Sequence, residues 1–225
     1  MENDTSKNRQ LKVAFLLDPD DLRNLQTLSS EIQGAIEYRV KFSDGSTIRY
    51  GDVDEIITQS NAGEKFIVAV TVSVDGESGR SLFLTMRGAP EPSVEYILAG
   101  TQRDVGYFSD KLDDWIASCT QWYSPFYASN LGVLLALGLF SLPIFFAGRV
   151  AKVFPPGKGD WHSYLSGVTL FGGWVVEYWV LKLFPRATFA IGYGAKREKF
   201  FNVIRVSVLL AIAVALLREW LGRHL

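Results

Sequence analysis

The side chains able to do chemistry are few, and their spacing does not build a reactive site. The chain has one cysteine, Cys119, and two histidines, His162 and His224. These counts exclude an intrachain disulfide and a cysteine- or histidine-rich zinc site. Both histidines lie in the C-terminal half, so no Ser-His-Asp arrangement is available, and the adjacent Asp113 and Asp114 would point in different directions on a helix. We therefore predict no catalytic residue, no metal ligand and no cofactor.

One carboxylate, Glu177, interrupts an apolar stretch at residues 164–184. An ionisable group inside a membrane span is costly and marks a functional site by default. His162 falls on the same helical face as Glu177, whereas Lys182 falls on the opposite side. The segment is either a third span with its polar stripe facing a helix bundle or an interfacial amphipathic helix. If it spans, Arg205 would enter the next helix at a similar depth, and we expect it to pair with Glu177.

A glycine- and cation-rich stretch precedes the last apolar segment. Gly192 and Gly194 permit unusual backbone angles, and Lys196 and Arg197 place charge beside exposed amides, which could hold a phosphate. The glycine spacing and ending of a P-loop are missing. We favour a glycine turn between a short strand and the last span, with Arg186 and its basic neighbours at lipid headgroups.

The N-terminal half supplies an α+β domain over residues 1–122. Alternating apolar residues predict strands, and short turns such as Asp44-Gly45 join them into a mostly antiparallel sheet. Helices are expected after Asp18-Pro19 and from Thr101, the latter with an apolar stripe that closes one face of the sheet. The expected strands lie at residues 11–17, 35–42, 47–50, 66–74, 82–86 and 94–98.

The C-terminal half, residues 123–225, is predicted to be an α-helical transmembrane domain. Residues 131–148 carry no charge, and their number reaches the threshold for a spanning helix. The spans are placed at about residues 128–149 and 201–220, with 162–184 as a third span or an interfacial helix. Within the last span Ser207, Ala211 and Ala215 recur every four residues, a pattern suited to close helix packing.

The two halves differ in charge. Residues 1–124 carry 12 basic and 20 acidic side chains, whereas residues 125–225 carry 11 basic and 4 acidic ones. The acidic head would repel nucleic acid, and the basic half suits anionic lipid. The first ten residues do not read as a signal peptide, so we expect a cytosolic head. The positive-inside tendency then favours three spans over two.

A wider resemblance rests on Phe184-Pro185, Phe189, Ile191-Gly192, Gly194 and Arg197, with Trp122-Tyr123 ahead of the first span. This pattern resembles a class of uncharacterised bacterial small membrane proteins with a cytosolic α+β head. The resemblance implies the bacterial inner membrane and two principal spans, which opposes the charge argument for three. It implies no known activity.

The sequence leaves three classes of function open. The first is a membrane-anchored interaction or sensor protein, in its finer form an oligomeric membrane effector in a bacterial defence or stress system. The second is a channel or transport component that uses Glu177, and the third, disfavoured by the missing motifs, is a membrane-bound enzyme. The expected partners are the lipid bilayer and either a second copy of the chain or a cytosolic protein, and not nucleic acid.

Overall fold

A computed structural model describes residues 4–59, 61, 65–76, 79–88, 93–128 and 182–224. The chain divides into two compact units, the first formed by Met1–Ser124 with Arg186–Leu225 and the second by Pro125–Pro185. The first unit thus joins the predicted head to residues beyond the predicted boundary at 122. The predicted span at 128–149 and the segment 162–184, with His162 and Glu177, lie almost wholly outside the described residues.

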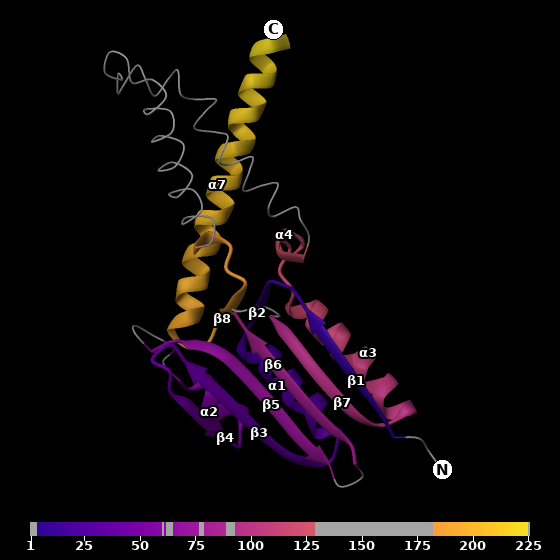
Figure 1. Ribbon diagram of the computed structural model, residues 1–225. Coiled ribbons are helices and arrows are strands. Elements are labelled where there is room, and N and C mark those ends of the chain that lie inside the picture. The colour runs from indigo at the N-terminus through magenta and orange to yellow at the C-terminus, as the bar shows by residue number, and fades with distance from the viewer. Residues whose placement is uncertain are drawn as a thin grey trace, which may run out of the picture. The chain divides into compact units, whose positions relative to one another are not determined.

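A six-stranded antiparallel sheet forms the head, with the strand order β1-β7-β6-β5-β3-β4 (Figure 1). Consecutive strands mostly pair through short turns, as in the Asp44-Gly45 turn, where Gly45 takes a φ of 84°. The strands are β1 (Asp4–Leu11), β3 (Gly34–Phe42), β4 (Thr47–Tyr50), β5 (Ile67–Gly76), β6 (Ser81–Arg87) and β7 (Val94–Thr101). The head is therefore α+β with a large antiparallel sheet.

Strand β1 was not expected, because its sequence is almost entirely polar. It runs along the edge of the sheet beside β7, and its Lys7 and Arg9 side chains bond Ser109 and Asp113 of the covering helix. The inward face of this strand is thus satisfied by polar partners. A hydrophobic alternation, the usual signal of a strand, is absent for that reason.

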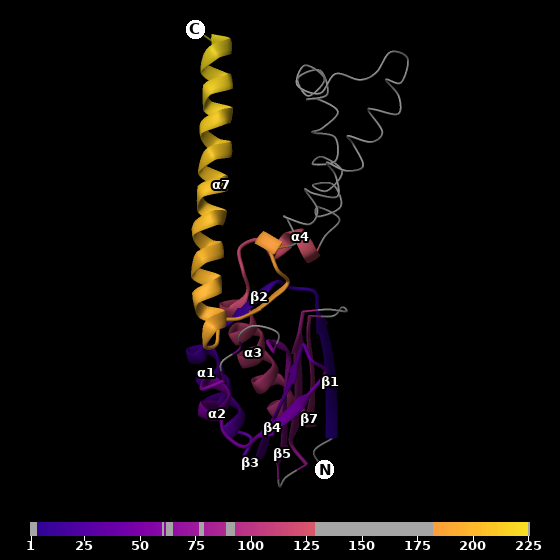
Figure 2. The ribbon, with the colours of Figure 1, turned by 90° about the vertical axis from the view of Figure 1, so that its left-hand side faces the viewer.

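Three helices cover one face of the sheet (Figure 2), namely α1 (Pro19–Ser30), α2 (Val53–Ile57) and α3 (Gln102–Cys119). Helix α1 begins where the sequence predicted. The Asp18 carboxylate accepts a hydrogen bond from the Asp21 amide at 2.8 Å, and the Asp21 carboxylate accepts one from the Asp18 amide at 3.1 Å. The hydrophobic core lies between these helices and the sheet, around Tyr38, Val72 and Leu84. On the opposite face of the sheet Phe83 and Ile97 remain exposed.

A second, two-stranded sheet joins distant parts of the chain. Strand β2 (Phe15–Leu17) pairs in parallel with β8 (Ala187–Phe189), and the long helix α7 (Tyr193–His224) follows β8 (Figure 1). The short strand and turn expected before the last apolar segment are thus present. In the second unit α4 (Pro125–Ala128) carries Tyr127, whose hydroxyl donates to the carbonyl of Phe184.

The predicted fold class is wrong in its transmembrane domain. Among the described residues, no helix is long and apolar enough to cross a membrane. Helix α7 has the length, but charged side chains crowd both its ends and Arg205 interrupts its middle. The uncharged run between Arg205 and Arg218 is shorter than the roughly 20 residues that a spanning helix needs.

Candidate functional site at the start of helix α7

Strand β8 is built into the head. The Phe15 amide donates to the Arg186 carbonyl at 2.9 Å, and the Ala190 amide donates to the Leu17 carbonyl at 2.8 Å. The Phe15 and Phe189 rings meet edge to face with centroids 5.7 Å apart. Phe189 and Ile191 belong to the head's hydrophobic core. The residues that lead into α7 are therefore held by the same core as the sheet.

One buried amide, Asn61, fastens this segment. Its Nδ2 donates to the carbonyls of Phe189 at 2.7 Å and Ile191 at 3.2 Å, and its Oδ1 accepts from the Ile67 amide at 2.8 Å. Asn61 takes a φ of 42°, a left-handed conformation that asparagine tolerates better than most residues. A single side chain thus joins the start of β5 to the turn before α7.

Of the two glycines of the predicted phosphate candidate, Gly192 lies in that turn and Gly194 lies in the first turn of α7. Gly192 has a φ of 54°. A Cβ on Gly194 would lie 2.2 Å from the Phe189 carbonyl oxygen and 2.5 Å from Asn61 Nδ2. Glycine at 194 is therefore required for close approach of α7 to the head, and the Gly194 amide donates to the Ile191 carbonyl at 2.9 Å.

Helix α7 carries a buried ion pair. The Arg205 guanidinium donates two hydrogen bonds to the Glu198 carboxylate, at 2.6 and 3.1 Å, and lies 5.5 Å from the centre of the Tyr123 ring. The Arg205 side chain is only 3% exposed and that of Glu198 14%. Glu198 was missed by sequence reasoning, although its position two turns before Arg205 on one helix face was a usable signal. The expected partner, Glu177, lies outside the described residues.

The cations of the first turns of α7 point to the surface. Lys196, Arg197 and Lys199 are exposed. The Lys196 ammonium lies 5.0 Å from the Tyr193 ring centre, and the Arg197 guanidinium lies 5.8 Å from that of Phe66 in the head. Arg186 is half-buried beside β8. The predicted cations 196 and 197 therefore share one end of α7, whereas Arg186 belongs to the connection before it.

Beyond these cations, α7 exposes large apolar side chains. Phe200, Val203, Val206, Leu210, Val214 and Leu217 are each between 57% and 66% exposed. The three predicted helix-packing residues all lie on α7, namely Ser207, Ala211 and Ala215, and Ser207 is exposed. These described side chains recur at helical spacing, so α7 presents a row of exposed apolar residues next to the basic ones.

Elsewhere in the head, polar groups serve structure. The Tyr96 hydroxyl lies 3.0 Å from both Ser109 Oγ and an Asp113 oxygen, beneath α3. Asp113 pairs with Arg9 of β1 and helps to hold α3 against β1 and β7. Burial raises the pKa of the Tyr96 hydroxyl, which keeps it protonated.

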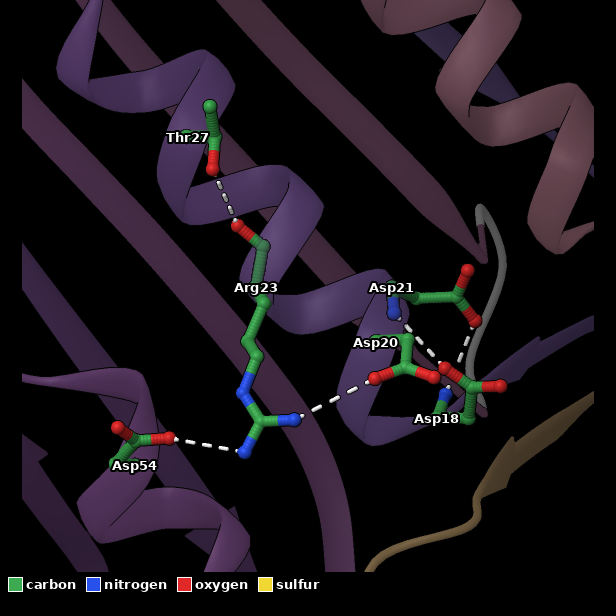
Figure 3. Close-up of polar contacts among 6 residues, drawn as sticks. All are labelled: Asp18, Asp20, Asp21, Arg23, Thr27 and Asp54. Atoms are coloured by element: carbon green, nitrogen blue, oxygen red, sulfur yellow. Dashed lines mark hydrogen bonds and ion pairs between the residues drawn. The ribbon is translucent and has the colours of Figure 1, made fainter.

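Two further side chains, Arg23 and Cys119, have structural roles in the helices that cover the sheet. The Arg23 guanidinium of α1 donates to the carboxylate of Asp20, on the same helix, at 3.4 Å and to that of Asp54, on α2, at 3.3 Å (Figure 3). Burial, chiefly, and the neighbouring Asp21 carboxylate raise the pKa of the Cys119 thiol to about 12, so the thiolate that a nucleophile needs does not form near neutral pH. Within the described ranges, no group of three or more potential metal ligands occurs.

Comparison of the chain with protein-family models, curated proteins and solved structures finds no match. Similarity therefore assigns neither a family nor an activity to the chain.

Proposed function

We propose that the protein is a membrane-attached interaction or sensor protein, in which the α+β head carries recognition and α7 attaches it to a lipid bilayer. The observation that carries the proposal is the row of exposed apolar side chains on α7, from Phe200 to Leu217. Contiguous apolar patches of this kind on soluble proteins mark interaction sites, since each Å² of exposed apolar surface costs roughly 25 cal/mol in water.

The burial of the charged residue in the middle of α7 supports contact of this helix with lipid. Arg205 is the one charged residue between Lys199 and Arg218, and its guanidinium is turned inward and neutralised by Glu198. On a helix that faces water, charged side chains are exposed and apolar side chains are buried. An amphipathic helix can bury its apolar side chains at the bilayer interface without crossing the membrane.

The junction supports a sensing role. Asn61 and the β2–β8 pairing fix the start of α7 to the head's core. A partner bound at the head would therefore act on a body that includes the first turns of α7. The uncovered face of the sheet, with Phe83 and Ile97 exposed, is the surface we propose for a protein partner. The finer proposal, an oligomeric effector on the cytosolic side of a bacterial inner membrane, rests on the sequence.

Vesicle flotation tests the attachment. The full-length protein should rise with phosphatidylcholine vesicles through a density gradient. A variant with Phe200→Ser, Val203→Ser and Leu210→Ser should stay at the bottom. The matched control, Phe83→Ser with Ile97→Ser, removes exposed apolar side chains from the head and should float normally. Flotation of the α7 variant to the same extent as the unaltered protein would refute lipid contact through this helix.

A further inference from the structure

We propose that the attachment selects anionic lipid, with Lys196, Arg197 and Lys199 contacting headgroup phosphates at the membrane surface. This inference rests on the proposed function and names its lipid class. All three cations are exposed, and none has an ion-pair partner among the described residues. They are therefore available to an external anion.

The only acid among these turns does not cancel the cations. Glu198 lies between Arg197 and Lys199 in sequence, but its carboxylate is engaged by the buried Arg205. The Glu198–Arg205 pair is neutral as a unit. The surface of the first turns of α7 therefore presents three positive charges without a competing exposed carboxylate on the same turns.

Two of the three basic residues share one face of α7 with the apolar row, whereas Arg197 lies about 100° around the helix from Lys196 and faces Phe66 of the head. Lys196, Lys199 and Val203 are spaced by three and four residues, and Phe200 lies between them on the same stripe. Residues at this spacing are neighbours on a helix surface. An exposed cationic band thus lies directly beside an exposed apolar row, the combination by which interfacial helices bind anionic membrane surfaces.

Two of the cations contact aromatic rings, one of them in the head and the other in α7 itself. Arg197 lies over Phe66, which the head contributes, and Lys196 lies over Tyr193, which is 59% exposed. Such contacts leave the cation charged and its remaining donors available. Because the cations are spread along and around the first turns of α7 instead of converging on one point, the complementary partner is a charged surface and not a single small phosphate.

Binding of the full-length protein to two vesicle types tests this inference. One type is phosphatidylcholine alone, and the other contains a quarter phosphatidylglycerol. Each cation near an anionic surface contributes on the order of fivefold, so the unaltered protein should bind the anionic vesicles on the order of 100-fold more tightly at low salt. The preference should shrink in 0.5 M NaCl, because salt screens these charges.

Charge-matched variants complete the test. Lys196→Gln with Arg197→Gln and Lys199→Gln should bind both vesicle types equally, at the affinity of the unaltered protein for the neutral vesicles. Lys41→Gln with Arg49→Gln and Arg103→Gln removes three exposed charges from the head and should keep the preference. Equal binding of the unaltered protein to both vesicle types, or an equal loss in the control, would overturn the inference and leave the attachment standing. Binding to neither type would contradict the attachment itself.

Discussion

Helices α3 and α7 follow opposite rules. Helix α3 buries Val105, Leu112 and Ile116 against the sheet and directs its charged residues to the surface or to polar partners. Helix α7 exposes apolar side chains such as Phe200 and Leu210 and buries its central charge, Arg205. The first pattern belongs to a helix whose apolar partner is the sheet of its own chain. The second is the pattern of a helix that meets an external apolar phase, which we propose to be lipid.

The buried charge of α7 should give the largest effect. Arg205→Met leaves the Glu198 carboxylate without its cationic partner, which should lower the free energy of unfolding by about 3–5 kcal/mol. Denaturant unfolding of the detergent-solubilised protein should show this loss. The double variant with Glu198→Gln removes both charges and should recover most of it. A double variant as unstable as the single one would mean that the pair itself is not the source.

Two leucines, one on each helix, test the contrast directly. Leu112→Ala opens a cavity in the head core and should cost about 2–5 kcal/mol of unfolding free energy. Leu210→Ala, at a position 64% exposed, should change stability by less than about 0.5 kcal/mol in the absence of lipid. Equal costs at both positions, measured by chemical denaturation, would show that the α7 row is covered by protein.

Two glycines extend the comparison to the junction. Gly194→Ala forces a Cβ against the Phe189 carbonyl and the Asn61 amide and should destabilise by about 1–3 kcal/mol. Gly106→Ala, within α3, meets nothing within 4 Å and should stabilise by about 1 kcal/mol through helix propensity. Hydrogen exchange of the amides at 189–194 should quicken in the first variant only. Unchanged exchange there would contradict the account of the junction.

The smallest expected effect concerns Cys119 on α3. Its folded pKa, raised to about 12 from a usual value near 9, favours the neutral thiol in the folded state. This contribution to stability is complete below about pH 9 and is lost as pH rises toward 12. Alkylation by iodoacetamide at pH 8 should be much slower in the folded protein than in urea. Rapid labelling of the folded protein would show that the thiol is accessible and ionised.

Local signals were sufficient for most of the head. The Asp18-Pro19 cap and the apolar stripe of α3 predicted their helices because both depend on residues close in sequence. Strand β1 was missed because Lys7 and Arg9 take polar partners on α3, so no apolar alternation marks it. The edge position of a strand cannot be read from its own residues.

The junction could be predicted only in part. The glycine turn before α7 was expected from composition, but Asn61 had no signal, because its two carbonyl partners lie about 130 residues away and are backbone atoms. The prediction of a spanning helix at 201–220 was wrong because it relied on the high apolar content of this segment. Arg205 and the charged ends of α7 limit its uncharged run to less than a membrane span needs.

Fluorescence at two single sites tests the central claim, lipid contact by α7, most directly. With Cys119→Ala as background, an environment-sensitive probe is attached at Leu210→Cys or, as control, at Phe83→Cys, both of which replace exposed apolar residues. On addition of anionic vesicles the emission of the probe at 210 should shift to the blue and gain intensity, while that at 83 stays constant. An unshifted spectrum at 210 under conditions where the protein floats with vesicles would contradict the account.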